Sequence, residues 1–178
     1  MKYDEFPGGR YSTKQDDFYW SGIAIKKLVH PESLNEHAVR MVRYPNPIIR
    51  LADLYLMYAE AYNEYYGPDA EAYRYLNEVR KRAGLPNVET VWSDGTIVKN
   101  INKHQTQEGL REIIQAERLI ELSFEGHRYF DLCRWKRAGE FFVSSVKGWN
   151  ARSGRTYEDF YQVTELQART CLLYTSPS

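Results

Sequence analysis

Carboxylates and guanidiniums are concentrated between Glu117 and Trp135, in the segment ERLIELSFEGHRYFDLCRW. Glu117, Glu121 and Glu125 recur at i, i+4, a spacing at which like charges on an isolated helix repel each other by roughly 0.2–0.5 kcal/mol per pair. Crowded carboxylates can act as general acids or bases, because perturbed pKa values cluster at functional sites. They can also form a structural ion network, since guanidiniums bind carboxylates bidentately and tolerate burial better than ammonium groups do.

Helical periodicity places the charges of this segment on a face that should be buried. An ordinary surface helix keeps its charges opposite its apolar stripe, so this helix is predicted to be enclosed and to break near Gly126. We therefore expect a semi-buried ion network that holds helical segments together, and not a catalytic cluster. Its predicted members are Glu117, Arg118, Glu121, Glu125, Arg128, Asp131, Arg134 and Trp135.

Aromatic residues form a second set of candidates, outside the charged segment. The chain contains 15 tyrosines and 4 tryptophans, and rings with one apolar and one wet end suit polar ligands such as sugars. We nominate Tyr19, Trp20 and Trp149 as rings that could stack on a pyranose face. Their predicted hydrogen-bonding neighbours are Asp16, Asp17 and Asn150. The alternative is that both stretches are ordinary loops, one folded onto the helices and the other facing solvent.

No motif indicates an enzyme, a cofactor or a metal centre. The patterns GxxxxGK[ST], GxGxxG, HExxH, GxSxG and the EF-hand loop are absent. Glu125, His127 and Asp131 could chelate a metal from one helix, but the set lacks a second histidine or a cysteine at ligand spacing. Basic and acidic residues balance at 24 each, so no overall field recruits nucleic acid. We predict a non-catalytic binding protein with no cofactor and no metal.

The elements that must position these residues are predicted to be mainly α-helical, with tetratricopeptide-like helix pairs and long irregular loops. Glycines that follow apolar periodic stretches, at positions 67 and 84, mark the ends of two helices. The predicted regions are 1–46 (loop-rich), 47–86 (helical hairpin), 107–142 (helical segments) and 143–170 (loop), with an irregular connection over 84–106. The last residues, 171–178, are interpreted as a non-native tail.

The hairpin has the pattern of one tetratricopeptide unit, carried by Tyr55, Tyr62, Ala72, Leu76 and Pro86. One copy of the pattern is visible. A single unit of this kind cannot bury its own stacking faces, so it is expected to have neighbours. This expectation indicates a larger parent protein.

Three segments in this order, PIIRLADLYLMYAEAYNE, YLNEVRKRAGLP and ERLIELSFEGHRYFDLCRW, resemble the C-terminal half of the SusD/RagB family, the glycan-capturing surface lipoproteins of Bacteroidetes. The resemblance implies a non-enzymatic protein whose ligand-binding loops decorate a tetratricopeptide-like scaffold. It also implies a lipid anchor at the outer membrane and a SusC-like TonB-dependent transporter as partner. The family's lipidated cysteine and its earlier helix pairs are missing. Residues 1–170 are therefore expected to be a fragment of a SusD-like domain, with the anchor in the missing N-terminal part.

Three functions are consistent with these residues. The first is capture of an oligosaccharide or other nutrient at the bacterial outer-membrane surface for a SusC-like TonB-dependent transporter. The second is an intracellular tetratricopeptide-type adaptor that grips a peptide in a helical groove. The third, an all-helical glycoside hydrolase, needs two carboxylates about 5 to 9.5 Å apart across an open cleft. Glu117 and Glu121 lie too deep in the predicted packing for that role.

Overall fold

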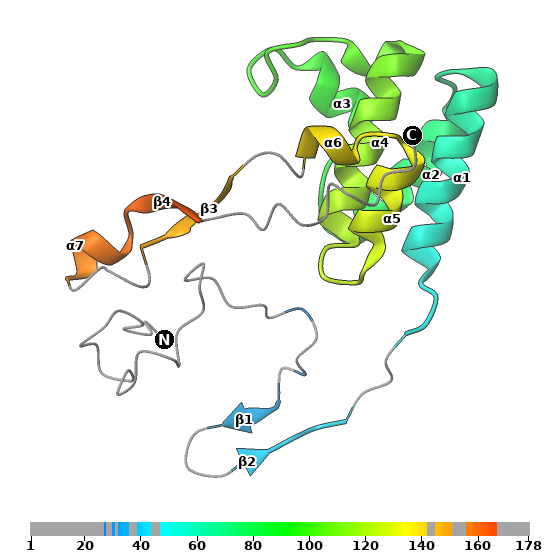
Figure 1. Ribbon diagram of the computed structural model, residues 1–178. Coiled ribbons are helices and arrows are strands. Elements are labelled where there is room, and N and C mark those ends of the chain that lie inside the picture. Colours follow the sequence, from blue (N-terminus) through cyan, green and yellow to red (C-terminus); the bar gives the residue numbers. More distant parts are fainter. Residues whose placement is uncertain are drawn as a thin grey trace. The chain divides into compact units, whose positions relative to one another are not determined.

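The computed structural model describes residues 27, 30, 32–35, 39–43, 47–141, 145–150 and 156–166. Helices predominate among them, which confirms the predicted mainly α class (Figure 1). The chain forms two compact units, which are described separately: residues 42–128, here called the helical unit, and residues 1–41 with 129–178. No helix of the described ranges has both the length and the hydrophobicity that crossing a membrane requires.

The helical hairpin consists of α1 (Leu51–Tyr66) and α2 (Ala70–Arg82). Gly67 ends α1 with φ +85° and Gly84 follows α2 with φ +72°, a left-handed conformation that costs glycine little. Asp69 is the N-cap residue of α2, a position at which aspartate is preferred, and its carboxylate accepts a hydrogen bond from the backbone N–H of Ala70 at 2.6 Å. The helix starts at Leu51, so the preceding proline segment leads into it and does not form its first turn.

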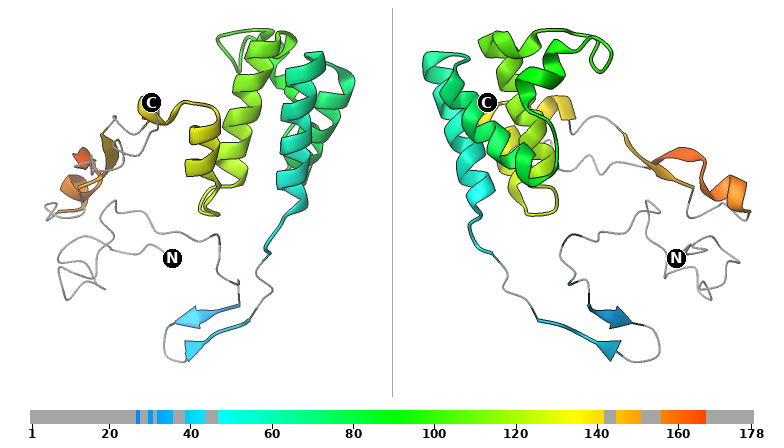
Figure 2. Two further views of the ribbon diagram at one scale, coloured as in Figure 1. Left: turned by 45° about the vertical axis from the view of Figure 1, so that its right-hand side comes forward. Right: turned by 180° about the vertical axis from the view of Figure 1, so that it is seen from behind.

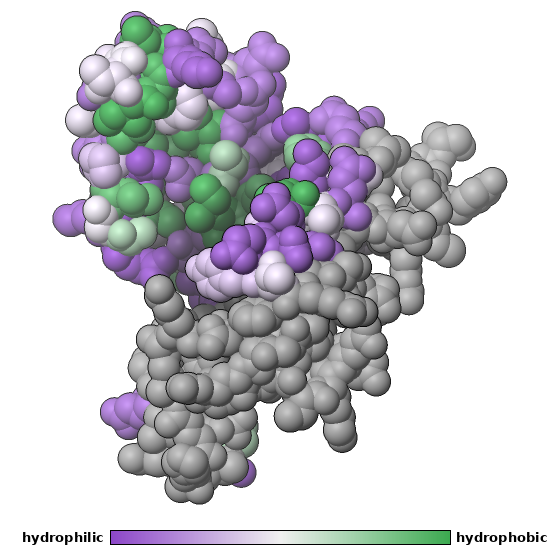
Figure 3. Space-filling view, turned by 90° about the vertical axis from the view of Figure 1, so that its left-hand side faces the viewer, coloured by the Kyte–Doolittle hydropathy of each residue, from purple (hydrophilic) through white to green (hydrophobic). Residues whose placement is uncertain are grey.

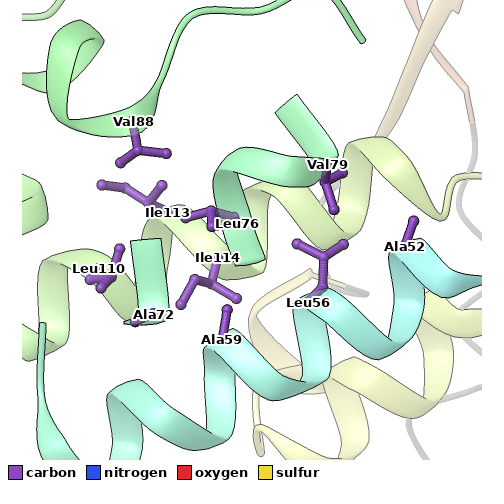
Figure 4. Packing of buried hydrophobic residues seen from close by; sticks show 10 residues of the cluster. All are labelled: Ala52, Leu56, Ala59, Ala72, Leu76, Val79, Val88, Leu110, Ile113 and Ile114. Carbon is purple, nitrogen blue, oxygen red and sulfur yellow. The ribbon is translucent and has the colours of Figure 1, made fainter. Parts of the chain in front are cut away.

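Buried side chains from four helices of this unit meet in one hydrophobic core. Leu56 and Ala59 of α1 point toward Leu76 of α2 and Ile114 of α4 (Gln107–Glu121), and all four are fully buried (Figure 4). Burying a side chain the size of Leu or Ile stabilises the fold by about 1.5–3 kcal/mol. The full cluster comprises Ala52, Leu56, Ala59, Ala72, Leu76, Val79, Val88, Leu110, Ile113 and Ile114.

The connection between α2 and α4 is more regular than the sequence predicts. It contains α3 (Val88–Ser93) and the short 3-10 helix η2 (Lys103–Gln105). Asn77 on α2 explains the first of these, because its side-chain oxygen accepts a hydrogen bond from the Val88 N–H at 2.9 Å. Such contacts between distant residues leave no periodic signal, so the prediction of an irregular connection is wrong for these two segments.

The helix over the charged segment breaks near the predicted glycine. α4 ends at Glu121 and α5 (His127–Arg134) begins after five intervening residues. Two residues of the turn have left-handed backbones, Gly126 with φ +84° and Phe124 with φ +64°. Phe124 is the unexpected one, because a Cβ makes that conformation unfavourable.

The other unit contains two antiparallel hairpins and short helices. β1 (Leu34–Asn35) pairs with β2 (Val39–Arg40), and α6 (Ala138–Phe141) follows α5. β3 (Val146–Trp149) pairs with β4 (Val163–Leu166), and α7 (Tyr157–Phe160) lies in the connection between them. The sequence predicts only loop over residues 143–170, and the β3–β4 hairpin with α7 is the correction. Both strands have four residues, too few for a clear alternation of apolar and polar positions.

Candidate functional site

Arg118 lies at the centre of the charged residues of the helical unit. Its side chain is 3% exposed, and its Nη1 donates a hydrogen bond to Asp53 Oδ1 at 2.9 Å. Its Nε lies 4.0 Å from Glu60 Oε2. Asp53 and Glu60 are 9% and 8% exposed and come from the face of α1 that packs against α4. A buried cation thus holds two buried carboxylates, an arrangement that is costly to break.

A second buried pair joins α2 to α4. Arg80 donates through Nη1 to Glu117 Oε1, and its Nε donates to the carbonyl oxygen of Pro86 at 2.8 Å. The two paired side chains are only 9% and 13% exposed. The Arg80 guanidinium therefore holds α2 against α4 and also fixes the segment that follows α2, at Pro86.

Arg50, just before α1, joins the end of α4. Its Nη2 donates to Glu121 Oε1 and its Nε to Glu125 Oε2, both at 2.8 Å. Arg82 adds a further bond to Glu121 Oε2 at 2.6 Å. Burial alone would lower the pKa of the Arg50 guanidinium. The hydrogen bonds from Glu125 and Glu121 outweigh that effect and raise the pKa above its ordinary value.

Each of the three glutamates at i, i+4 therefore accepts hydrogen bonds from guanidiniums outside α4. Arg50, Arg80 and Arg82 supply them, and the sequence reasoning did not nominate these residues. Arg80 and Arg82 are recognisable in the sequence as basic residues in the last turn of a helix, but the helix dipole is a sufficient reason for a basic residue at that position. Carboxylates that already accept hydrogen bonds from guanidiniums are typical of a structural clamp, which here joins α4 to α2 and to the start of α1.

The remaining residues of the proposed network lie on and beside α5. Arg134 donates through Nε and Nη2 to Asp131 Oδ1, at 3.1 and 3.0 Å. Its guanidinium carbon also lies 5.0 Å from the centre of the Trp135 ring, within cation–π range. Arg128 is half-buried in the first turn of α5. These contacts cap the end of α5, where Trp135 N–H donates to the Asp131 carbonyl at 2.9 Å.

Four aromatic rings gather in the hairpin between β3 and β4, here called the hairpin cluster: Trp149, Tyr157, Phe160 and Tyr161. The ring centres of Trp149 and Tyr161 lie 4.9 Å apart, and those of Tyr157 and Tyr161 lie 4.6 Å apart. Phe160 is buried and lies 6.0 Å from Trp149. Tyr157 and Tyr161 are 52% and 36% exposed, so the cluster has a buried anchor and an open aromatic surface.

The nominated ligand residues are divided by what the structure describes. Trp149 is half-buried in the hairpin cluster, and Asn150 follows it. The Asn150 N–H donates to the carbonyls of Phe160 and Gln162, at 2.9 and 3.0 Å, which fixes the strand end beside the rings. The other nominated residues, Asp16, Asp17, Tyr19 and Trp20, lie outside the described residues. Tyr157 and Tyr161 were not among the predicted ligand residues, although both lie in the aromatic run RTYEDFY.

A pocket of about 360 Å³ lies beside the start of α4. It is lined by residues 100–103 and by the first turns of the helix. Lys103 and Glu112, on its wall, form an ion pair with each other. No aromatic side chain is among its lining residues, so the pocket lacks the stacking surface of the hairpin cluster.

Comparison with known proteins gives a consistent result. The model of the SusD family (SusD_RagB) matches residues 1–171. The chain is 46% identical over 88 residues to SusD-like protein P25 of Formosa agariphila, a match that covers 49% of this chain and 15% of the relative. It is 39% identical over 94 residues to SusD-like protein P2 of the same organism, covering 53% of this chain and 17% of the relative. These matches thus span less than a fifth of the length of the curated relatives.

Proposed function

The chain belongs to the SusD family, and on that premise we propose that it serves the non-catalytic capture of an oligosaccharide or similar nutrient. The full proposal is capture at the bacterial outer-membrane surface, by a lipid-anchored protein, and delivery to a SusC-like TonB-dependent transporter. Family membership is the observation that carries the proposal. The intracellular adaptor has no comparable support, because the matched relatives are SusD-like proteins.

The ligand surface is proposed to include the hairpin cluster, with Trp149 and Asn150 beside Tyr157 and Tyr161. Two neighbouring rings that are partly exposed, and tilted by 56° to each other, offer apolar ring surface together with hydroxyl groups that suit a polar ligand. The remaining nominated residues, Tyr19 and Trp20 with Asp16 and Asp17, are proposed to contribute to the same ligand. Phe160 is buried beside these rings and anchors the hairpin from that side.

A non-catalytic role agrees with the state of the acidic residues in the helical unit. Glycoside hydrolysis needs one carboxylate that gives a proton and a second that faces the sugar across a cleft. Glu117 and Glu121 instead accept hydrogen bonds from Arg80, Arg50 and Arg82. We therefore assign these carboxylates to the clamp and not to a reaction.

The test is direct binding of hexasaccharides by isothermal titration calorimetry. The panel comprises α- and β-linked glucan, xylan and mannan hexamers, each followed for released reducing ends. We expect at least one ligand to bind without hydrolysis. Replacement of Tyr161 by alanine should weaken the affinity for that ligand by about tenfold or more, which corresponds to a loss of about 1.4 kcal/mol of binding free energy. Phe130→Ala, which removes a 71% exposed ring of α5, is the control and should leave affinity unchanged.

Three results would contradict the proposal. Binding of no hexamer would remove the capture function for this class of ligand. Release of reducing ends would show catalysis. Equal loss of affinity in Tyr161→Ala and Phe130→Ala would mean that the hairpin cluster is not the ligand surface.

A further inference from the structure

The pocket of about 360 Å³ at the start of α4 belongs neither to the clamp nor to the hairpin cluster. It lies where the connection from α3 reaches α4, and that connection loops outward at this end of the helical unit (Figures 1 and 2). The clamp contacts of Glu121 lie at the opposite end of the same helix. Small-molecule sites in proteins occupy about 300–1,000 Å³, so a ligand that fills this pocket is small.

The wall of the pocket is mostly polar. Hydrophilic and hydrophobic areas lie side by side on the surface of the helical unit (Figure 3), and the pocket lining has the same mixed character. Ile101 contributes apolar surface, Asn100 and Asn102 contribute amides, and charged side chains complete the wall. A lining of this kind offers little apolar surface to bury, so its ligand must be recognised through hydrogen bonds and charge.

Several polar groups of the wall already have partners within the protein. Lys103 and Glu112 form an ion pair, and the Lys103 ammonium also lies 5.5 Å from the centre of the Trp92 ring, within cation–π range. The Thr106 hydroxyl oxygen caps α4, because it accepts a hydrogen bond from the Gly109 N–H at 3.1 Å. These groups are therefore engaged before any ligand binds.

Glu108 and Asn100 are the exceptions. Within the part of the chain that the structure describes, neither side chain has a hydrogen bond or an ion pair. Arg111 follows Glu108 by about one turn, but it donates two hydrogen bonds of 2.6 Å to Glu64. The hydrogen bond with Glu64 is the main cause of the raised pKa of Arg111, to which Glu108 adds only through space. The pocket therefore has one uncompensated negative charge, at Glu108.

We propose that this pocket binds a small molecule through a primary ammonium group, which donates hydrogen bonds to the Glu108 carboxylate and to the Asn100 side-chain oxygen. An ammonium group has three donors and a positive charge, so it matches a carboxylate and an amide oxygen that are both unengaged. Two kinds of molecule carry this group, amino sugars and the amino ends of peptides. Ile101, which is 50% exposed, supplies the apolar surface beside it. The proposal concerns the helical unit alone and does not depend on nutrient capture at the hairpin cluster.

An NMR titration of the ¹⁵N-labelled 178-residue chain tests this proposal residue by residue. The probes are glucosamine and glycinamide, one for each source, and their N-acetylated forms, which lack the ammonium group. The titration is made at about pH 6, so that the amines carry their proton. We expect at least one of the two ammonium probes to shift the backbone signals of residues 100–112 in a saturable way. Its N-acetylated form should bind about tenfold more weakly or not at all.

Glu108→Gln separates the effect of charge from that of the shape of the pocket. It should weaken the binding of the ammonium probe by about tenfold or more. Glu78→Gln is the control, because it removes the same charge from an exposed position of α2 and should leave the affinity unchanged. Both positions are exposed, so neither change should alter the Tm.

The two ammonium probes distinguish the sources of the ligand. Binding of glucosamine alone would assign the site to amino sugars, and binding of glycinamide alone would assign it to the amino ends of peptides. The proposal would be overturned if neither probe shifts these signals, or if the N-acetylated forms bind equally well. An equal effect of Glu108→Gln and Glu78→Gln would overturn it as well.

Discussion

Arg118→Ala should destabilise the helical unit far more than an ordinary loss of an ion pair does. Arg118 is 3% exposed and faces two carboxylates, Asp53 at 2.9 Å and Glu60 at 4.0 Å, which are themselves almost fully buried. Removing one partner of a buried pair costs about 3–5 kcal/mol, because the remaining charge has neither water nor a counter-ion. That is a large share of a domain stability of about 5–15 kcal/mol.

The assay is urea denaturation followed by circular dichroism at 222 nm. With an m-value of about 2 kcal/mol per molar urea, a loss of 4 kcal/mol moves the midpoint down by about 2 M. Arg111→Ala is the matched control, since it removes the same side chain from the same helix and breaks a pair with α1. That pair is exposed, at 38% and 40%, so its loss should cost no more than about 1 kcal/mol.

The identity of the stranded groups can be tested by rescue. Combining Arg118→Met with Asp53→Asn and Glu60→Gln removes both carboxylates, and it should restore most of the lost stability because no uncompensated charge remains. Equal midpoints for Arg118→Ala and Arg111→Ala would refute the reasoning. The reasoning would also be refuted if the triple variant is no more stable than Arg118→Ala. This comparison still applies if Arg118→Ala does not fold, because the triple variant should then fold.

Two further predictions concern the local structure of the helical unit. Gly109→Ala should destabilise the protein by at least about 1–3 kcal/mol, the usual cost of overpacking, because the new Cβ would overlap the Lys103 carbonyl oxygen. Gly139→Ala is the control, since its Cβ would meet no atom within 4 Å, and thermal denaturation should show it to be neutral or slightly stabilising. The hydrogen bond to Asp69 raises the pKa of Tyr62, so its contribution to stability is present below the ordinary tyrosine pKa and is lost as pH rises through the raised value. Asp69→Asn should lower the pKa of Tyr62 in an absorbance titration at 295 nm, and an unchanged titration would contradict this assignment.

The sequence predicts the helices better than it predicts their partners. Periodicity and glycine positions indicate α1 and α2, because those signals act within one segment. The acidic spacing on α4 indicates that cations must be close, yet it does not indicate which ones. Arg118 binds α1 rather than its own neighbours, and Arg50 lies 71 residues from Glu121. Contacts over such separations are set by packing and have no local pattern.

The aromatic hairpin shows the same limit from another side. Trp149 is recognisable as a candidate by type alone, but Tyr157 and Tyr161 reach it only because β3 pairs with β4 in one register. A strand of four residues gives too short a pattern to predict that pairing. The sequence shows that the run RTYEDFY is rich in aromatic residues, but it does not show that Tyr161 of this run contacts Trp149.

Ligand capture is proposed to occur on the aromatic residues outside the helical clamp. The most direct test is an NMR titration of the indole N–H signals, which number 4 because the chain has 4 tryptophans. With the tightest-binding hexasaccharide of the panel, the signals of Trp149 and Trp20 should shift in a saturable way, and those of Trp92 and Trp135 should stay in place. Shifts confined to Trp92 or Trp135, or no shift at any indole under saturating ligand, would contradict the claim.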